Sequence, residues 1–221
     1  MPEVVLLCSV HKENGRCNSS ELVRILELIE PDVLFEEIPY FEFLEKNNLG
    51  NGRILEVRAI SKYLERHKVL QIPVDTLDGS SFEQIKFDQV IDRVSHTSPE
   101  FRSLWDHKTY LEYTRGFEYL NSRSNDSMLR RSDSIVTKAL EELNDERLSM
   151  AYDEWKTYNS KREDAMIGNV YEFCRLTNFK KGVFLFGSGH RQSLISKIKM
   201  VKKTEKGRVN WKLDCGVSNW E

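Results

Sequence analysis

Short apolar runs alternate with amphipathic segments in the first third of the chain, a pattern typical of strands joined by helices. Val4–Leu7 is a continuous apolar run, which predicts a buried strand. The apolar residues of Leu22–Ile29 then keep a helical period, and Pro31 ends this helix before the next apolar run, Val33–Phe35. Because strand, helix and strand form a βαβ unit, we expect strands 4–7 and 33–36 to be parallel neighbours joined by a right-handed crossover.

The same alternation predicts three further strands, at 69–75, 183–186 and 209–213. A loop rich in Asn and Gly at 46–53 and a helix over about 54–67 precede the first of them. We therefore expect an α/β fold with a mixed, largely parallel sheet flanked by helices.

Between residues 82 and 179 the pattern changes, and apolar and aromatic residues recur only at helical spacing. This block predicts a helical insertion of three to five helices, over about 82–180, inside a single domain that spans 1–221. The segment 121–134 is the most loop-like part of it, and its three arginines indicate a solvated face rather than a lid.

Composition narrows the class of partner. The chain has 33 basic and 35 acidic residues, a net charge of −2, so a global attraction to nucleic acid or to an anionic membrane is not expected. No apolar run approaches the length that crosses a bilayer. The four cysteines show no CxxC spacing, which favours reduced thiols and a cytoplasmic protein. The composition leaves open whether the protein forms a homo-oligomer.

Four polar side chains that can carry chemistry stand at the ends of the predicted strands: His11, Glu36, Asp75 and His190. The last of these follows the turn Gly187–Gly189, whose glycines would let the backbone turn sharply and let a ligand approach. Because ligands bind in open α/β sheets at the carboxyl ends of the strands, these residues predict one site on one rim.

Two imidazoles and one carboxylate suit a divalent cation such as Mn, Co or Zn and leave open positions for water. The metal would lower the pKa of that water and polarise a carbonyl, so a peptide or small acyl bond would be the substrate. The alternative is that each histidine is an ordinary hydrogen-bonded residue, and that strand ends are polar because the chain returns to water.

Other residues would support such a site. Arg162 and Glu163 begin a predicted helix over about 162–175, where an arginine can hold a carboxylate or an oxyanion; otherwise they form an exposed charge pair. Glu56, near the start of its helix, is favoured there by the helix dipole. Cys8, three residues before His11, is more readily explained by packing than as a thiolate nucleophile.

The order of these motifs resembles the TraB/PrgY and Tiki group, which belongs to a clan with the erythromycin esterase-like and ChaN-like proteins. The resemblance rests on LCSVH at 7–11, on PDVLFE at 31–36, on Glu56, on Arg162 and on GSGH at 187–190. It covers most of the chain. Only the second of the two GxxH motifs is complete, because Cys8 stands where the first has glycine.

In Tiki proteins this site looks like a metal-dependent peptidase centre. That resemblance implies a metal set of His11, Glu36 and His190, with Arg162, Glu163, Glu56 and Asp75 as catalytic support. Strand alternation sends Glu36 and Glu37 to opposite faces, and the motif register favours Glu36 as the ligand. Glu37, Gly187, Ser188 and Gly189 are then candidates for substrate binding.

Our leading expectation is a divalent-metal-dependent hydrolase. A metal-independent, esterase-type hydrolase with a histidine base is the second expectation. The third is a non-catalytic binding or signalling module on the same fold, which the replacement of glycine by Cys8 favours.

Overall fold

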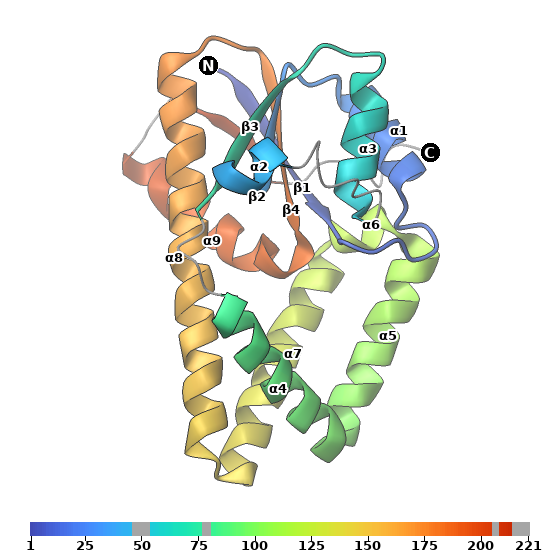
Figure 1. Ribbon diagram of the computed structural model, residues 1–221, viewed down its shortest axis with the longest axis vertical. Coiled ribbons are helices and arrows are strands. Elements are labelled where there is room, and N and C mark those ends of the chain that lie inside the picture. The colour runs from blue at the N-terminus through green and yellow to red at the C-terminus, as the bar shows by residue number, and fades with distance from the viewer. Residues whose placement is uncertain (46–53, 77–80, 205–207, 214–221) are drawn as a thin grey trace.

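The computed structural model describes residues 1–45, 54–76, 81–204 and 208–213 (Figure 1). The loop predicted at 46–53 and Cys215 lie outside these described residues, whereas the strand predicted at 209–213 lies within them. Among them, no helix is both long enough and apolar enough to cross a membrane.

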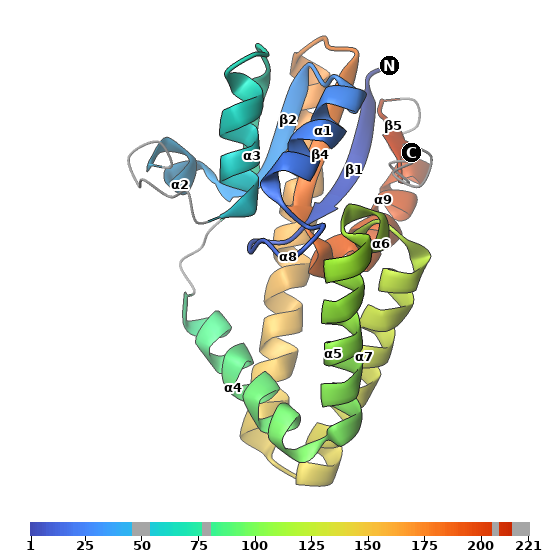
Figure 2. The same cartoon turned by 90° about the vertical axis from the view of Figure 1, so that its right-hand side faces the viewer.

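The fold is α/β, as predicted, and the pairings between its strands are all parallel. The strands are β1 (Glu3–Ser9), β2 (Val33–Pro39), β3 (Leu70–Asp75), β4 (Lys181–Gly187) and β5 (Asn210–Lys212). Two helices, α1 (Ser19–Ile29) and α3 (Leu55–Leu64), lie on one face of the sheet (Figure 2). The short α2 (Tyr40–Glu45) follows β2.

The strand order is β3-β2-β4-β1-β5, so the prediction that β1 and β2 are neighbours is wrong. β4 lies between them and pairs with both. Its residues 182–186 are all buried, which suits a central strand, and Gly182 leaves room for the rings of Phe35 and Phe179, which a Cβ would meet at 3.0 and 3.1 Å. Hydrophobic periodicity identifies a strand but does not encode its place in the sheet, and the carboxyl ends still share one rim.

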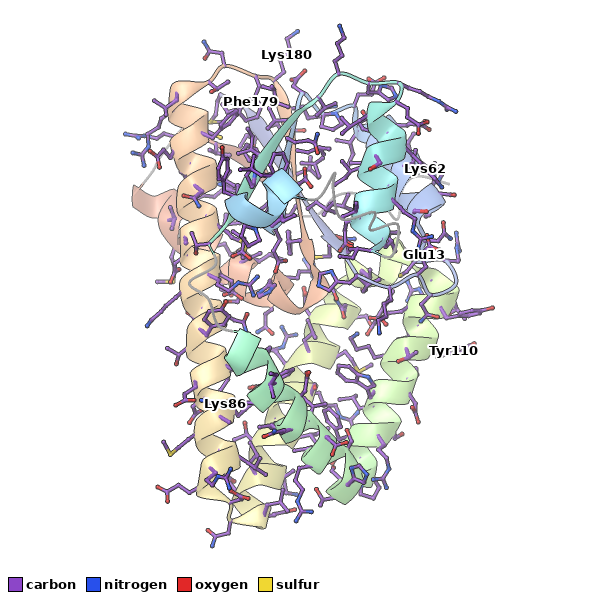
Figure 3. All side chains as sticks on the ribbon, viewed as in Figure 1. Glu13, Lys62, Lys86, Tyr110, Phe179 and Lys180 are labelled. Atoms are coloured by element: carbon purple, nitrogen blue, oxygen red, sulfur yellow. The ribbon has the colours of Figure 1, made fainter. Side chains whose placement is uncertain are left out.

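The insertion is helical, as predicted, and it forms an arm that extends beyond the carboxyl ends of the strands (Figures 1 and 2). Its helices are α4 (Ser81–Thr97), α5 (Pro99–Arg115), α6 (Phe117–Leu120), α7 (Arg123–Leu143) and α8 (Glu146–Leu176). The arm has its own apolar core, separate from the core around the sheet. Figure 3 shows Lys86 of α4 beside α8, where it pairs with Glu154 at 2.7 Å.

Two expectations about the arm are wrong. Segment 121–134 is not a loop, because Ser122 accepts the Asn125 N–H and begins α7, whose many polar residues lie on its solvent face. The helix expected to begin near Arg162 is the second half of α8, a single helix of 31 residues. Its first half packs in the arm and its second half on the sheet, and α9 (Arg191–Thr204) follows β4.

Candidate functional site

Glu37 is the centre of a buried network at the rim where β2, β3 and β4 end. Its Oε1 accepts from Arg162 Nη2 at 2.9 Å and lies 3.1 Å from His190 Nε2. Its Oε2 accepts the backbone N–H of Gly187 at 2.7 Å. One carboxylate therefore joins the second and fourth strands to α8.

Arg162 reaches the rim from α8 and holds two acids. Its Nε and Nη2 donate to the two carboxylate oxygens of Asp75 at 3.1 and 2.6 Å, and its Nη1 donates to Asn159 Oδ1 at 3.0 Å. Burial disfavours the charged guanidinium, but hydrogen bonding and the charges of Asp75 and Glu37 outweigh burial and raise the pKa of Arg162. This bidentate fork fixes the second and third strand ends to one helix.

His190 lies between two carboxylates. Its Nδ1 is 2.8 Å from Glu163 Oε1, while Nε2 faces Glu37. Burial acts to lower the pKa of His190, but the charge of Glu37 and the bonds to both acids raise it to about 9. Burial likewise acts to raise the pKa of Glu37, and the charge and hydrogen bond of His190 bring it down to about 2. At neutral pH, His190 is an imidazolium that donates from both nitrogens.

Both carboxylate oxygens of Glu163, on the far side of His190, have hydrogen-bond partners. Its second carboxylate oxygen accepts from the Ser193 hydroxyl and lies 3.9 Å from Lys197 Nζ. Asp75, Glu37 and Glu163 thus alternate with Arg162 and His190 in one chain of opposite charges.

His11 stands apart from this network, with 72% of its side chain exposed. Its Nδ1 lies 3.2 Å from Glu56 Oε1, and the Ser9 hydroxyl donates to the same oxygen at 2.6 Å. The bond to Glu56 raises the pKa of His11 against the opposing effect of burial, and the charges of Glu56 and Glu37 add to the rise. The His11 carbonyl accepts the Leu55 N–H at 3.0 Å, which holds the histidine at the start of α3.

A small cavity of about 160 Å³ lies beside His11, and Glu36, Glu37 and Glu56 also line it. The rest of its wall is mainly apolar and consists of Ile38, Ile54, Val57, Ile60, Leu185, Phe186 and Gly187. A polar end that carries an imidazole and carboxylates therefore faces an apolar pocket.

The β2 acid that binds His190 is Glu37 and not Glu36, which the motif register favoured as the metal ligand. Glu36 is buried and pairs in the strand with Leu185 of β4 and Pro73 of β3. The register of β2 against β3 shifts between Glu36 and Pro39, and simple alternation does not anticipate such an irregularity.

The expected metal set is not assembled. Among the described residues, no group of three or more His, Cys, Asp or Glu side chains is placed to hold a metal ion. His190 has no free lone pair for a metal, because both of its nitrogens face carboxylates as donors. His11, Glu36 and His190 therefore do not fit a shared Mn, Co or Zn ion, and we derive no step through one.

The turn after β4 also differs from expectation. Neither Gly187 nor Gly189 has a positive φ, and a Cβ on Gly189 would meet no atom within 4 Å. Ser188, Gly189 and His190 form a short 3₁₀ turn that lines a second, larger cavity. The two glycines are thus not required by a strained turn.

Asn121 and Ser9 are site residues that sequence reasoning missed. Asn121 binds both the N–H and the carbonyl of Cys8, at 2.8 and 3.2 Å, and so supports the strand that leads to His11. A contact between residues 113 positions apart has no local signal. Cys8 itself is fully buried in the core, in agreement with the packing interpretation.

Comparison of the chain with protein-family models, with curated proteins and with solved structures gave no match, so the resemblance to the TraB/PrgY and Tiki group stays a prediction.

Proposed function

We propose that this protein is a metal-independent hydrolase of small acyl esters in which His11 is the general base. The observation that carries the proposal is the His11–Glu56 pair, 3.2 Å apart, at the mouth of a small apolar cavity. Glu56 fixes the proton on Nδ1, which leaves Nε2 as an acceptor toward solvent. An exposed imidazole oriented by a carboxylate can take a proton from water near neutral pH.

In the proposed reaction, His11 Nε2 takes a proton from a water molecule as the water oxygen bonds to the ester carbonyl carbon. The imidazolium then returns that proton to the departing alkoxide as the ester C–O bond breaks. The products are a carboxylic acid and an alcohol. Ile38, Val57 and Phe186 would receive a short apolar acyl chain, because they line a cavity of only about 160 Å³.

The buried network has a supporting part in this proposal. Arg162 and His190 keep Glu37 ionised at the wall of the cavity, with its pKa at about 2. The fixed negative charges of Glu37 and Glu56 make His11 a stronger base than a free imidazole. Cys8, Cys17 and Cys174 form no disulfide, which supports the further proposal that the protein acts in the cytoplasm. Membership of the TraB/PrgY and Tiki group is proposed with it.

Hydrolysis of p-nitrophenyl acetate and butyrate tests the proposal, with and without EDTA. We expect the value of kcat/KM to fall by roughly 100-fold or more in His11→Asn, the usual contribution of a general base, and to be unchanged by the chelator. His96→Asn is the matched control, because its side chain is also 72% exposed. Equal activity in the two variants, or activity lost in EDTA and restored by metal, would contradict the proposal.

Glu56→Gln separates the role of the carboxylate from that of the imidazole. Because Glu56 raises the pKa of His11, its removal shifts both the NMR titration of His11 and the acid limb of the rate profile to lower pH. Asp92→Asn, which removes the acid 3.5 Å from His96, leaves both measurements unchanged. A His11 titration that does not move in Glu56→Gln refutes the proposed pair.

A non-catalytic binding module is the second candidate. The observation in its favour is that both nitrogens of His190 and the guanidinium of Arg162 are already occupied within the protein. Absence of turnover in the wild type, together with ligand binding, would support this candidate over the hydrolase.

A further inference from the structure

A second cavity, of about 690 Å³, lies between the helical arm and the carboxyl end of β4. Residues from α4, α5, α7, α8, the 3₁₀ turn and α9 line it. Figure 1 shows α4 and α7 below the lower end of β4, with α8 passing beside it. The volume falls within the range of natural small-molecule sites.

One wall of this cavity is a set of parallel aromatic rings. The ring centroids of Phe87 and Trp155 are 3.8 Å apart with planes at 10°, and Tyr152 lies parallel to both within 6.4 Å. Ile91, Trp105, Leu129 and Val136 extend the apolar wall. Parallel rings that line one wall favour a flat apolar ligand over a branched one.

The charged groups around the cavity are already paired within the protein. Lys108 binds Glu112, and Lys156 lies 3.1 Å from Asp153. Asp133 accepts from the Tyr152 hydroxyl at 2.7 Å, and Glu163 is bound by His190. An anionic ligand would have to compete with Glu112 and Asp153 for these two lysines, so an uncharged ligand is favoured over an anionic one.

Two serine hydroxyls that line the cavity, those of Ser193 and Ser196, can accept a hydrogen bond from a ligand. The hydroxyl of Ser193 donates to Glu163, and that of Ser196 donates to the Gln192 carbonyl at 3.0 Å. A hydroxyl whose proton is committed keeps oxygen lone pairs that accept. A ligand that meets these oxygens must therefore supply an O–H or N–H group.

We propose that this cavity binds an uncharged organic molecule with a flat ring system and at least one O–H or N–H donor. The rings lie against Phe87, Tyr152 and Trp155, and the donor faces Ser193 and Ser196. This site is separate from the cavity at His11, and the proposal holds whether or not His11 is a catalytic base.

Three probes of the same ring test the proposal by NMR titration of the full chain. We expect 2-naphthamide, flat and uncharged with an N–H donor, to bind with a measurable Kd. We expect 2-acetonaphthone, which lacks the donor, and 2-naphthoate, which is anionic, to bind at least tenfold more weakly. No saturable binding of 2-naphthamide, or equal or tighter binding of either other probe, overturns the proposal.

Two substitutions on α7 locate the binding. Ser132 lines the cavity, and Ser132→Phe should fill it and weaken 2-naphthamide binding at least tenfold. Ser134 is exposed on the same helix outside the cavity, so Ser134→Phe should bind like the wild type. Unchanged binding in Ser132→Phe overturns the site. His11→Asn should bind as the wild type does, which keeps this test independent of hydrolysis.

Discussion

His190 is held as a cation by an acid on each side, and this makes the stability of the fold depend on pH. The pKa of His190 rises from 6.5 to about 9 on folding. The stabilisation is therefore complete below about pH 6.5 and is lost as the pH rises through about 9, with an upper limit of about 3 kcal/mol.

We expect His190→Gln to remove this dependence. The difference in free energy of unfolding between wild type and variant, from urea titrations, should be largest at pH 6 and shrink by pH 9.5. The comparison cancels Cys17 and Cys174, whose pKa values are raised by burial and which are common to both proteins. The same difference at both pH values would show that His190 is not held as an imidazolium.

At the residue scale, the sequence located the site better than it assigned the roles. His190, Glu163, Arg162 and Asp75 do meet at one rim, because each stands at a strand end or on the helix beside it. The sequence could not show that carboxylates take up both nitrogens of His190, since partners in a fold are set by packing in three dimensions.

Among the elements, β1 is bonded to the residue that ends α6, a buried Asn121. Asn121 supplies the partners for the backbone N–H and carbonyl of Cys8, where β1 extends beyond its pairing with β5. Asn121→Ala removes both of these buried hydrogen bonds, so we expect the free energy of unfolding to fall by about 2–3 kcal/mol. Urea unfolding at pH 7 measures this loss.

Asn14→Ala is the matched control for that substitution, because Asn14 also donates its amide to a backbone carbonyl, that of Thr109 at 3.3 Å, in an exposed position. We expect a loss below about 0.5 kcal/mol there. Similar losses in the two variants would mean that the Asn121 bonds do not hold the arm to the sheet.

The predicted elements were most accurate for the strands of the sheet and least accurate at the polar start of α7. Strands β1, β2 and β4 are recognisable in the sequence as unbroken apolar runs, because both faces of a central parallel strand are covered. The polar start of α7 has no such apolar pattern, since the buried apolar residues of this helix begin only at Ile135. Strand order was the other failure, because one periodicity fits several positions in a sheet.

On the scale of the whole molecule, α8 is the element that the two cores share. Its Ala151 and Tyr152 belong to the core of the arm, whereas Met166 and Val170 belong to the core around the sheet. Figure 1 shows this helix along the full length of the molecule. Because an intact helix transmits order from one core to the other, we expect the arm and the sheet to unfold together.

Hydrogen exchange in increasing urea tests this coupling. In the wild type, amides of α5 and of β4 should lose protection with the same denaturant dependence. Lys161 is exposed on α8 between the two cores, and Lys161→Pro, which costs a helix about 3 kcal/mol or more, should let the arm open at lower urea than the sheet. Lys161→Ala keeps the helix and should leave the two sets together. If the arm and the sheet already open separately in the wild type, then α8 does not couple them and the chain behaves as two cooperative units.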